Sequence, residues 1–263
     1  MRAGAGAATA RGMGGAALGR VGWSLVSLGA LVLIWSLVAA LLQSRVFPGP
    51  LAVLHTLVHE ARTGALAHHI LATLARVVVS FVVAMAIGTA IGLALGINKS
   101  ADRFFDSWLI FFLNLPALVI IILCYVWFGL TETAAITAVA INKIPNVAVQ
   151  VREGARGLSK DLDEMARIYK FGWWRKLRHV TLPQLGAFFM AAARSGLSLV
   201  WKIVLVVELL GRSNGVGHQL HVAFQLFDVP MILAYAIAFI AVVQVIEFAV
   251  LQPLDARINR WRR

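Results

Sequence analysis

Residues 70–96 read ILATLARVVVSFVVAMAIGTAIGLALG, an apolar run in which Arg76 is the one charged side chain. A helix of about 20 apolar residues crosses the roughly 30 Å hydrocarbon layer of a bilayer. The run is long enough for such a crossing, so it predicts a membrane-spanning helix. Comparable runs occur at residues 22–42, 107–128, 133–151, 186–210 and 231–254. The sequence thus predicts an all-α integral membrane protein with about six transmembrane helices.

The composition agrees with this fold class. Hydrophobic residues make up 60% of the 263 residues and charged residues 14%, whereas a soluble domain carries about 25% charged residues. The formal net charge is +12, but the basic side chains lie between the apolar runs and are not interleaved with aromatic ones, as they are on base-stacking surfaces. We therefore expect a lipid membrane, and no nucleic acid, as the partner of this charge. The lone Cys124 fits a small buried hydrophobe.

The basic residues also predict the orientation, because cytoplasmic loops of membrane proteins carry an excess of lysine and arginine. With six spans, seventeen basic residues fall on the side of both termini and three on the opposite side. We therefore expect both termini in the cytoplasm, in a multi-pass protein of the bacterial cytoplasmic (inner) membrane. The first apolar run exceeds the roughly 7–15 residues of a signal-peptide core, and we expect it to remain as an anchor.

Two segments outside the spans have a composition of their own. Residues 1–20 are rich in glycine and alanine and predict a disordered cytoplasmic tail, which leaves residues 21–263 as the transmembrane domain. Residues 48–66 carry an apolar stripe that predicts a short amphipathic helix on the external face. The stripe consists of Leu51, Leu54, Leu57, Val58 and Ala61.

The longest hydrophilic stretch, residues 152–185, reads REGARGLSKDLDEMARIYKFGWWRKLRHVTLPQL. Ser159 is the expected N-cap of a short helix with acidic residues in its first turn. The chain is expected to break or turn sharply at Gly172. Trp173 then starts a second amphipathic piece, which Pro183 closes before the next span. By composition alone, the stretch is also compatible with a positively charged topological loop.

Several ionisable side chains fall at bilayer depth. Such a group costs at least about 2.5–3.5 kcal/mol at a helix centre, so it usually faces protein or water. In one interpretation, Lys202, Arg194 and Arg76 make a translocation path favourable to an anionic solute. In the other, the two arginines snorkel or bridge helices near a membrane boundary. Glu208 is a further pathway candidate, six residues from Lys202 and therefore not on the same helix face; Lys143 also lies within a span.

Three uncharged residues join the pathway candidates. Asn114 and Pro116 lie within a span, where a proline frees a carbonyl and kinks the helix, either at a gate or without such a role. Trp201 lies next to the candidate lysine of its span. We expect no metal site, because His55 and His59, four residues apart, do not complete a tetrahedral ligand set.

The sequence gives no support for an intramembrane enzyme. Paired carboxylates, a serine–histidine arrangement or a metal cluster at bilayer depth are not evident. A phosphate-binding loop of the form G-x-x-x-x-G-K-[ST] is also missing from the sequence. We therefore expect no catalytic residue and no cofactor in this chain.

The hydrophilic loop resembles the cytoplasmic signature of the permease subunits of bacterial ATP-binding cassette (ABC) importers. That signature has an EAA triplet, a glycine six residues after the second alanine, and then a leucine–proline pair. This chain has at those positions Glu164, Met165, Ala166, Gly172, Leu182 and Pro183. Methionine replaces the middle alanine of the triplet, a change expected to alter packing more than role.

The flanking spans extend the resemblance. Residues 69–96, 113–129 and 198–220, together with FPGP at 47–50, resemble the permeases of the nitrate/sulfonate/taurine type. The resemblance covers nearly all of residues 47–260. It implies a type I ABC importer permease fold, in which the six signature residues form a coupling loop that docks on a separate ATP-binding subunit.

The resemblance also implies a function: a transmembrane permease subunit that moves a small, anionic solute such as a sulfonate, nitrate or taurine across the inner membrane. It further implies two ATP-binding cassette subunits that bind ATP and magnesium, a second permease copy forming a homodimer, and an external solute-binding protein. The alternative is a stand-alone secondary transporter or channel driven by a gradient. Six spans would be few for many such carriers, and the basic loop would then lack a purpose.

Overall fold

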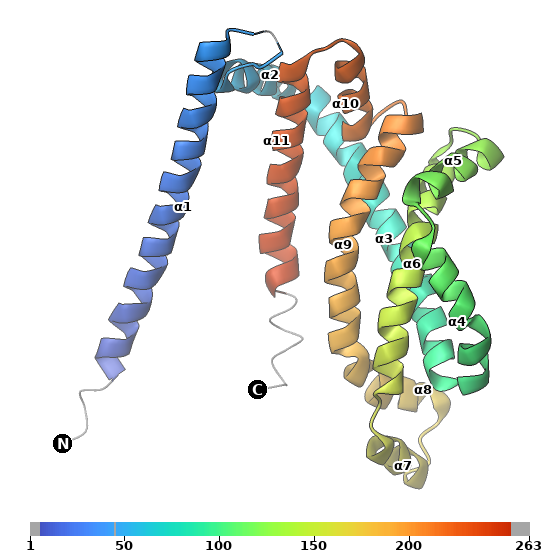
Figure 1. The fold of residues 1–263 in the computed structure, drawn as a ribbon. Helices are drawn as coiled ribbons and strands as arrows, with labels where there is room; N and C mark the ends of the chain where they lie inside the picture. Colours follow the sequence, from blue (N-terminus) through green and yellow to red (C-terminus); the bar gives the residue numbers. More distant parts are fainter. Residues whose placement is uncertain (1–5, 45, 254–263) are drawn as a thin grey trace.

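The computed structural model describes residues 6–44 and 46–253, and these residues form helices joined by short loops, with no strand among them (Figure 1). The long helices run along one another, and α7 and α8 extend from one end of the molecule (Figure 1). The α-helices are α1 (Gly6–Leu42), α2 (Pro50–Thr63), α3 (Ala65–Ile97), α4 (Lys99–Asn114), α5 (Ala117–Phe128), α6 (Glu132–Arg156), α7 (Lys160–Ile168), α8 (Trp173–Lys176), α9 (Leu182–Gly211), α10 (Val216–Gln225) and α11 (Val229–Ile246). Two π-helical turns, η1 (Leu177–Thr181) and η2 (Glu247–Leu251), join α8 to α9 and follow α11.

The predicted all-α membrane fold is confirmed. Four described helices are long and apolar enough to cross a membrane: α3, α6, the continuous helix Trp173–Gly211 and the helix Val229–Ala249. The pair α4 and α5 forms a fifth candidate if it counts as one span. The described apolar part of α1, Val26–Leu42, is shorter than these. The count of six spans and the cytoplasmic position of both termini remain predictions.

Close packing of α3 against α6 forms the centre of the helix bundle. A methyl group added at Gly92 would lie 2.5 Å from the carbonyl oxygen of Ala148, and Gly88 and Gly96 approach α6 as closely. Helices in lipid associate through such close contact rather than through the hydrophobic effect, and small residues allow it. Glycines at every fourth position of α3 therefore determine which of its faces meets α6.

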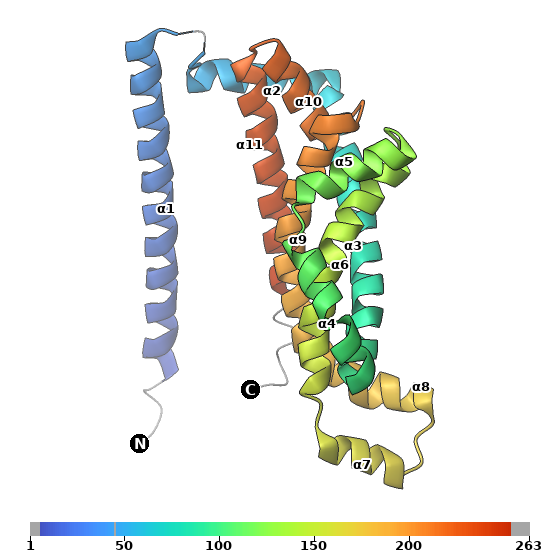
Figure 2. The same ribbon diagram turned by 45° about the vertical axis from the view of Figure 1, so that its right-hand side comes forward.

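Helix α1 stands apart from the other long helices and is joined to them through α2 (Figures 1 and 2). The indole Nε1 of Trp35 donates to the carbonyl oxygen of Pro48 at 3.0 Å, which ties α1 to the segment before α2. The structure differs here from the sequence prediction, because residues 6–20, expected to be disordered, continue α1 as a helix. Alanine, frequent in this segment, is the strongest helix former.

The predicted span 107–128 is not one kinked helix. Helices α4 and α5 meet at an angle of 92°, with Leu115 in an extended conformation and Pro116 at the N-cap of α5. A residue before proline is driven out of the helical region by the proline ring, so the chain breaks rather than bends. Helix α5 has no charged side chain, and the charged side chains of α4 lie in its first half. The break redirects α5 across the end of the bundle (Figure 2).

Pro183 was predicted to end a short helix before the next span, and this helix end is also absent from the structure. Helix α8, the π-helical turn η1 and α9 form one continuous helix from Trp173 to Gly211, and Pro183 lies in the first turn of α9. A proline in a first helical turn is tolerated because its missing N–H costs little there. The wider π-helical turn directly before it does not end the helix either, because π-helical turns, although rare, occur mostly as single turns inside α-helices. Pro183 therefore does not separate the loop from the next span.

The amphipathic helix predicted within residues 48–66 is present as α2. It begins at Pro50, and Gly64, with a φ of 82°, ends it in the left-handed conformation that glycine favours. Val53 is its buried residue, whereas Leu51 and Leu54 of the predicted stripe are exposed within this chain. The stripe thus points away from the bundle, where the membrane or another chain can cover it.

Candidate functional site

The loop between α6 and α9 folds into two short helices at one end of the molecule (Figures 1 and 2). Ser159 caps α7, since its hydroxyl oxygen accepts a hydrogen bond from the backbone N–H of Leu162 at 3.4 Å. Asp161 and Asp163 lie in the first turn, where carboxylates stabilise the positive end of the helix dipole. The predicted start of this helix and its acidic first turn are confirmed.

Contacts inside the loop hold its two helices together. Ala166 is buried, and its carbonyl oxygen accepts a hydrogen bond from the N–H of Phe171 at 2.9 Å. The ammonium of Lys176 in α8 pairs with Asp163 in α7, and this hydrogen bond holds the pKa of the Asp163 carboxyl below its usual range. The Asp163 carboxylate is therefore charged at neutral pH. The two helices form one small unit rather than an unstructured loop.

Gln184 anchors this unit to α9, a role that the sequence analysis did not assign. Its side-chain oxygen accepts from the backbone N–H of Ser159 at 2.9 Å, and its amide nitrogen donates to the carbonyl oxygen of Val180 at 2.9 Å. The start of α7 is thus joined to the start of α9. The sequence gives no indication that a glutamine makes such a contact. The position of Gln184, directly after Leu182 and Pro183, shows only that it adjoins the signature residues.

The six predicted coupling residues divide into a buried and an exposed set. Ala166 is buried and Met165 is half-buried, so these two face the loop itself. The exposed members are Glu164, Gly172, Leu182 and Pro183. Around them the loop exposes large apolar side chains: Leu162, Ile168, Tyr169, Trp173 and Trp174. Exposed apolar side chains gathered on one small unit are typical of a surface that binds another protein.

Gly172 has an ordinary backbone conformation, with φ −61° and ψ 156°. A methyl group added there would meet no atom within 4 Å. Neither the backbone nor the packing of this chain therefore requires a glycine at position 172. A requirement for glycine would have to come from the close approach of another molecule.

A buried carboxylate, Glu208, lies near the opposite end of the bundle. Its side chain is 0% exposed. It accepts hydrogen bonds from the hydroxyl of Thr73 at 2.9 Å, from Nη1 of Arg76 at 2.6 Å and from the N–H of Gly217 at 2.9 Å. Three donors, one of them charged, compensate the burial of this carboxylate.

Arg76 extends this arrangement to α6 and to the loop after α9. Its guanidinium donates to both carboxylate oxygens of Glu132, at 2.8 and 2.6 Å, and also to the carbonyl and side-chain oxygens of Asn214. Arg212 donates to the same Glu132 at 2.7 Å. We refer to Arg76, Glu132, Glu208, Arg212 and Asn214 as the Glu208 network. It joins α3, α6 and α9.

The turn after α9 fits closely around Glu208. Gly215 has a φ of 108°, a conformation that side chains rarely adopt, and a methyl group there would lie 2.3 Å from the Glu208 carboxyl carbon. At Gly217 it would lie 2.2 Å from the carbonyl oxygen of Leu205. These two glycines allow the N-terminus of α10 to point its N–H groups at Glu208 and Thr73.

The seven predicted pathway residues do not converge in one chain. Arg76 and Glu208 pair inside the Glu208 network. Trp201 is buried against the ring of Phe239 in α11, with ring centroids 5.7 Å apart. Arg194 pairs with Glu247 at 3.1 Å on the surface of the bundle. Lys202, Asn114 and Pro116 are exposed, and the amide of Asn114 donates to a carbonyl of its own helix at 2.7 Å.

Lys143 is the most deeply buried lysine that the structure describes. Its side chain is 1% exposed, and its ammonium has no hydrogen-bond partner among the described residues. It crosses from α6 to α9, where a methyl group at Gly196 would lie 2.6 Å from its Cε atom. Gly196 therefore makes room for the lysine.

The histidines of α2 and α3 lie in different surroundings. The Nδ1 of His69 accepts from the N–H of Gly215 at 3.1 Å, and its Nε2 lies 2.6 Å from the amide nitrogen of Gln219. His55 and His59 line a shallow external groove on α2. In the described part of the chain, no three His, Cys, Asp or Glu side chains are grouped so as to hold a metal ion.

The structure is a bundle of membrane helices with a compact, partly apolar two-helix unit at one end, a surface suited to contact with a second protein. Its class is that of the membrane subunits of transport systems. The chain belongs to the family described as the binding-protein-dependent transport system inner membrane component, whose model matches residues 84–258. It is accordingly a multi-pass protein of the bacterial inner membrane and an ABC importer permease of the sulfonate/taurine type.

Similar proteins of known name support this placement. The chain is 27% identical to the putative aliphatic sulfonates transport permease protein SsuC of Bacillus subtilis (strain 168), over 92% of this chain and 89% of that protein. It is 32% identical to the protein of the same name from Escherichia coli (strain K12), over 72% of each. The taurine transport system permease protein TauC of Escherichia coli (strain K12) is 26% identical over 90% of this chain and 89% of its own length.

Solved structures share the fold. A chain of the MetNI methionine ABC transporter in an inward-facing conformation superposes with a TM-score of 0.62 at 19% identity, covering 74% of this chain and 98% of that one. A chain of an amino acid ABC transporter crystallised with histidines gives a TM-score of 0.59 at 21% identity, covering 76% and 97%. At these identities the likeness concerns the fold alone.

Proposed function

We propose that this permease subunit imports a small anionic solute of the sulfonate or taurine kind, driven by ATP hydrolysis in separate subunits. Two ATP-binding subunits that bind ATP and magnesium, a second copy of this chain and an external solute-binding protein complete the proposed importer. The relatives named for aliphatic sulfonates and taurine support the solute class. The observation that carries the proposal is the exposed two-helix unit of α7 and α8, with open space where a side chain at Gly172 would lie.

The unit is suited to transmit a movement. Helix α7 follows α6 after a short turn, and α8 continues without interruption into α9. Gln184 and the Asp163–Lys176 pair keep the unit compact. A partner that binds α7 and moves it would therefore shift α6 and α9 together, because the two-helix unit moves as one rigid body.

We test this with three forms of the full chain, purified in mild detergent with whatever proteins accompany it. Gly172→Trp fills the open space beside α7, and Glu164→Ala removes an exposed carboxylate of the same surface. Both should lose an accompanying ATP-binding subunit and reduce ATP-driven taurine or alkanesulfonate uptake at least about tenfold, with the melting temperature unchanged. Gly22→Trp is the matched control, since a side chain at Gly22 also meets no atom within 4 Å.

The outcomes separate the two candidate functions. Loss of the ATP-binding subunit in the loop variants and not in Gly22→Trp supports the importer. A chain that purifies without any ATP-binding subunit, and whose uptake persists without ATP but follows an ion gradient, would mean a secondary transporter instead. In that case the open space beside Gly172 would have no functional meaning.

Lys202 is the exposed cation best placed to meet an anionic solute. It lies in the middle of α9 at membrane depth and has no ion-pair partner in the described residues. We expect Lys202→Ala to lower uptake about tenfold, the effect of losing one hydrogen bond to a charged group. Assembly with the partner subunits should be unchanged, and Lys202→Arg should retain most of the uptake. Unchanged uptake in Lys202→Ala would remove this lysine from the pathway.

A further inference from the structure

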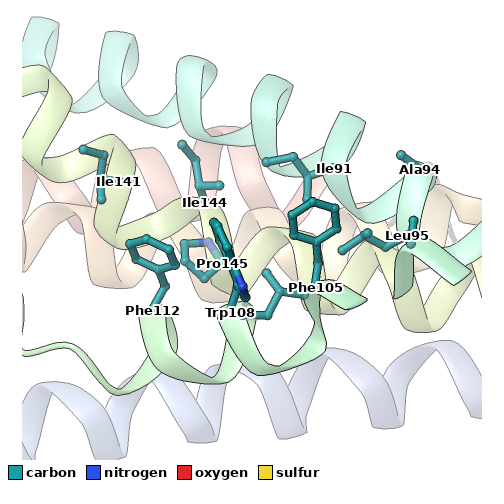
Figure 3. A pocket seen from close by; sticks show the side chains of 11 residues that line it. Ile91, Ala94, Leu95, Phe105, Trp108, Phe112, Ile141, Ile144 and Pro145 are labelled. Carbon is teal, nitrogen blue, oxygen red and sulfur yellow. The ribbon is translucent and has the colours of Figure 1, made fainter. Parts of the chain in front are cut away.

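An apolar cavity of about 570 Å³ lies between α3, α4 and α6 (Figure 3). Phe105, Trp108 and Phe112 line it along successive turns of α4, and Ile91 of α3 and Ile144 of α6 face them across the space (Figure 3). The lining is entirely apolar. The space is open on one side, and its lining offers no polar atom to hold a water molecule, so an apolar group is the expected occupant.

A charged pocket of about 690 Å³ adjoins this cavity at the start of α4. Leu95 lines both spaces, so the two are neighbours along α3. Lys99, Arg103 and Arg156 contribute cations to the charged pocket. An apolar space therefore leads to a group of positive charges, at the end of the bundle that carries α7 (Figure 1).

The charged side chains around this pocket differ in whether they already have an ion-pair partner. Arg152 pairs with Asp102 at 3.2 Å and with Asp106 at 2.6 Å, and Arg156 pairs with Asp102 at 2.5 Å. Both aspartates are thus neutralised by α6. Lys99 and Arg103 are exposed and have no ion-pair partner among the residues that the structure describes. The pocket has two cations available for an external anion.

We propose that this pair of spaces is a binding site for an anionic phospholipid, with one acyl chain in the apolar cavity and the phosphate between Lys99 and Arg103. Basic pockets between membrane helices bind anionic lipid head groups, chiefly on the cytoplasmic side. The predicted orientation places these residues on that side. A free phosphate ion would use the cations and leave the adjoining cavity unexplained, whereas a phospholipid explains both.

The site gives the lipid a structural role. It lies where α4 packs on α3 and α6, directly before the 92° break that leads to α5. A lipid bound there fills the space between α4 and the rest of the bundle, and it thus fixes the position of α4 and α5. The inference concerns the membrane and is independent of the solute and of the ATP-binding partner.

The test is lipid retention by the full chain, with its accompanying proteins, in mild detergent and measured by native mass spectrometry with added phosphatidylglycerol. We expect Lys99→Gln combined with Arg103→Gln to weaken phosphatidylglycerol binding roughly twenty-fivefold, about fivefold for each cation. Lys160→Gln combined with Arg178→Gln removes the same charge from the exposed loop and should leave binding unchanged.

A second pair of variants tests the acyl-chain half of the site. Ala94 lines the cavity, and Ala94→Phe should fill it and weaken binding at least about fivefold while both cations remain. Ile97→Phe, an exposed position on the same helix that does not line the cavity, is its control. Phosphatidylcholine should bind more weakly than phosphatidylglycerol to the unaltered chain.

Three results would overturn the proposal. The first is equal phosphatidylglycerol binding by the Lys99/Arg103 variant and the unaltered chain. The second is displacement of phosphatidylglycerol by glycerol 3-phosphate at similar concentrations, which would indicate a site for soluble anions. The third is an Ala94→Phe variant that retains the lipid but loses a second copy of the chain, which would make the cavity a protein interface.

Discussion

Glu208→Ala is expected to destabilise the protein by about 3–5 kcal/mol, the cost of breaking a buried ion pair by removing one partner. The variant removes the carboxylate acceptor of the N–H of Gly217, and it removes one of two acceptors from Nη1 of Arg76 and from the hydroxyl of Thr73. It also opens a space beside Gly215, which is shaped around the carboxyl group. Thermal unfolding in detergent should begin about 10 °C lower or more.

Glu153→Ala is the matched control for this prediction. Glu153 is also a paired carboxylate, 2.7 Å from Arg156, but it is half exposed at the loop end of α6. Exposed pairs of this kind contribute at most about 1 kcal/mol. If Glu208→Ala and Glu153→Ala unfold at the same temperature, the Glu208 network does not stabilise the fold. Glu208→Gln, which keeps an acceptor oxygen without the charge, should lie between them.

Gly92→Leu is expected to cost roughly 3 kcal/mol or more, the upper end of the range for overpacked cores. The first carbon of the new side chain would lie 2.5 Å from the carbonyl oxygen of Ala148 and 2.8 Å from the side chain of Val151. A backbone oxygen cannot rotate away as a side chain can, so α3 and α6 have to separate. The yield of folded protein in size-exclusion chromatography should fall, together with the melting temperature.

Gly29→Leu provides the comparison for the α3 variant. Gly29 lies in α1, where an added methyl group meets no atom within 4 Å. A substitution in open space usually changes stability by less than about 0.5 kcal/mol. If Gly29→Leu is as harmful as Gly92→Leu, leucine at a membrane glycine is harmful for reasons other than the α3–α6 contact.

Much of the fold follows from local sequence. The apolar runs predicted α3, α6, α9 and α11 correctly. A helix in lipid satisfies its backbone hydrogen bonds within its own segment, so each run predicts its helix without knowledge of the rest of the fold. The N-cap at Ser159 was also predictable from local sequence, because the N–H that its hydroxyl accepts from belongs to Leu162, three residues later. The residues that resemble the permease signature could also be found in the sequence, because their spacing is a property of the chain, but their role in coupling remains a prediction.

Details of helix continuity were harder to predict. Pro116 was expected to kink a span and instead lies at a 92° break, whereas Pro183 was expected to end a helix and instead lies within one. A proline excludes the N–H donor at one position, but whether the chain then breaks or continues depends on what surrounds it. Pro183 follows a π-helical turn, and Gln184 bonds a carbonyl of that turn at 2.9 Å.

The sequence by itself determined that the chain is a helical membrane protein, because this follows from the length of its apolar runs. The coupling role of the loop is a prediction from the resemblance to ABC importer permeases. Tertiary structure alone decided what the buried charges do. Arg76 and Glu208, 132 residues apart, were pathway candidates in sequence and form an ion pair at 2.6 Å in the structure. Their pairing depends on which faces of α3, α6 and α9 meet, and close glycine contacts set those faces. A charge in a membrane span usually faces protein or water, and only the packing of the helices decides which groups it meets there.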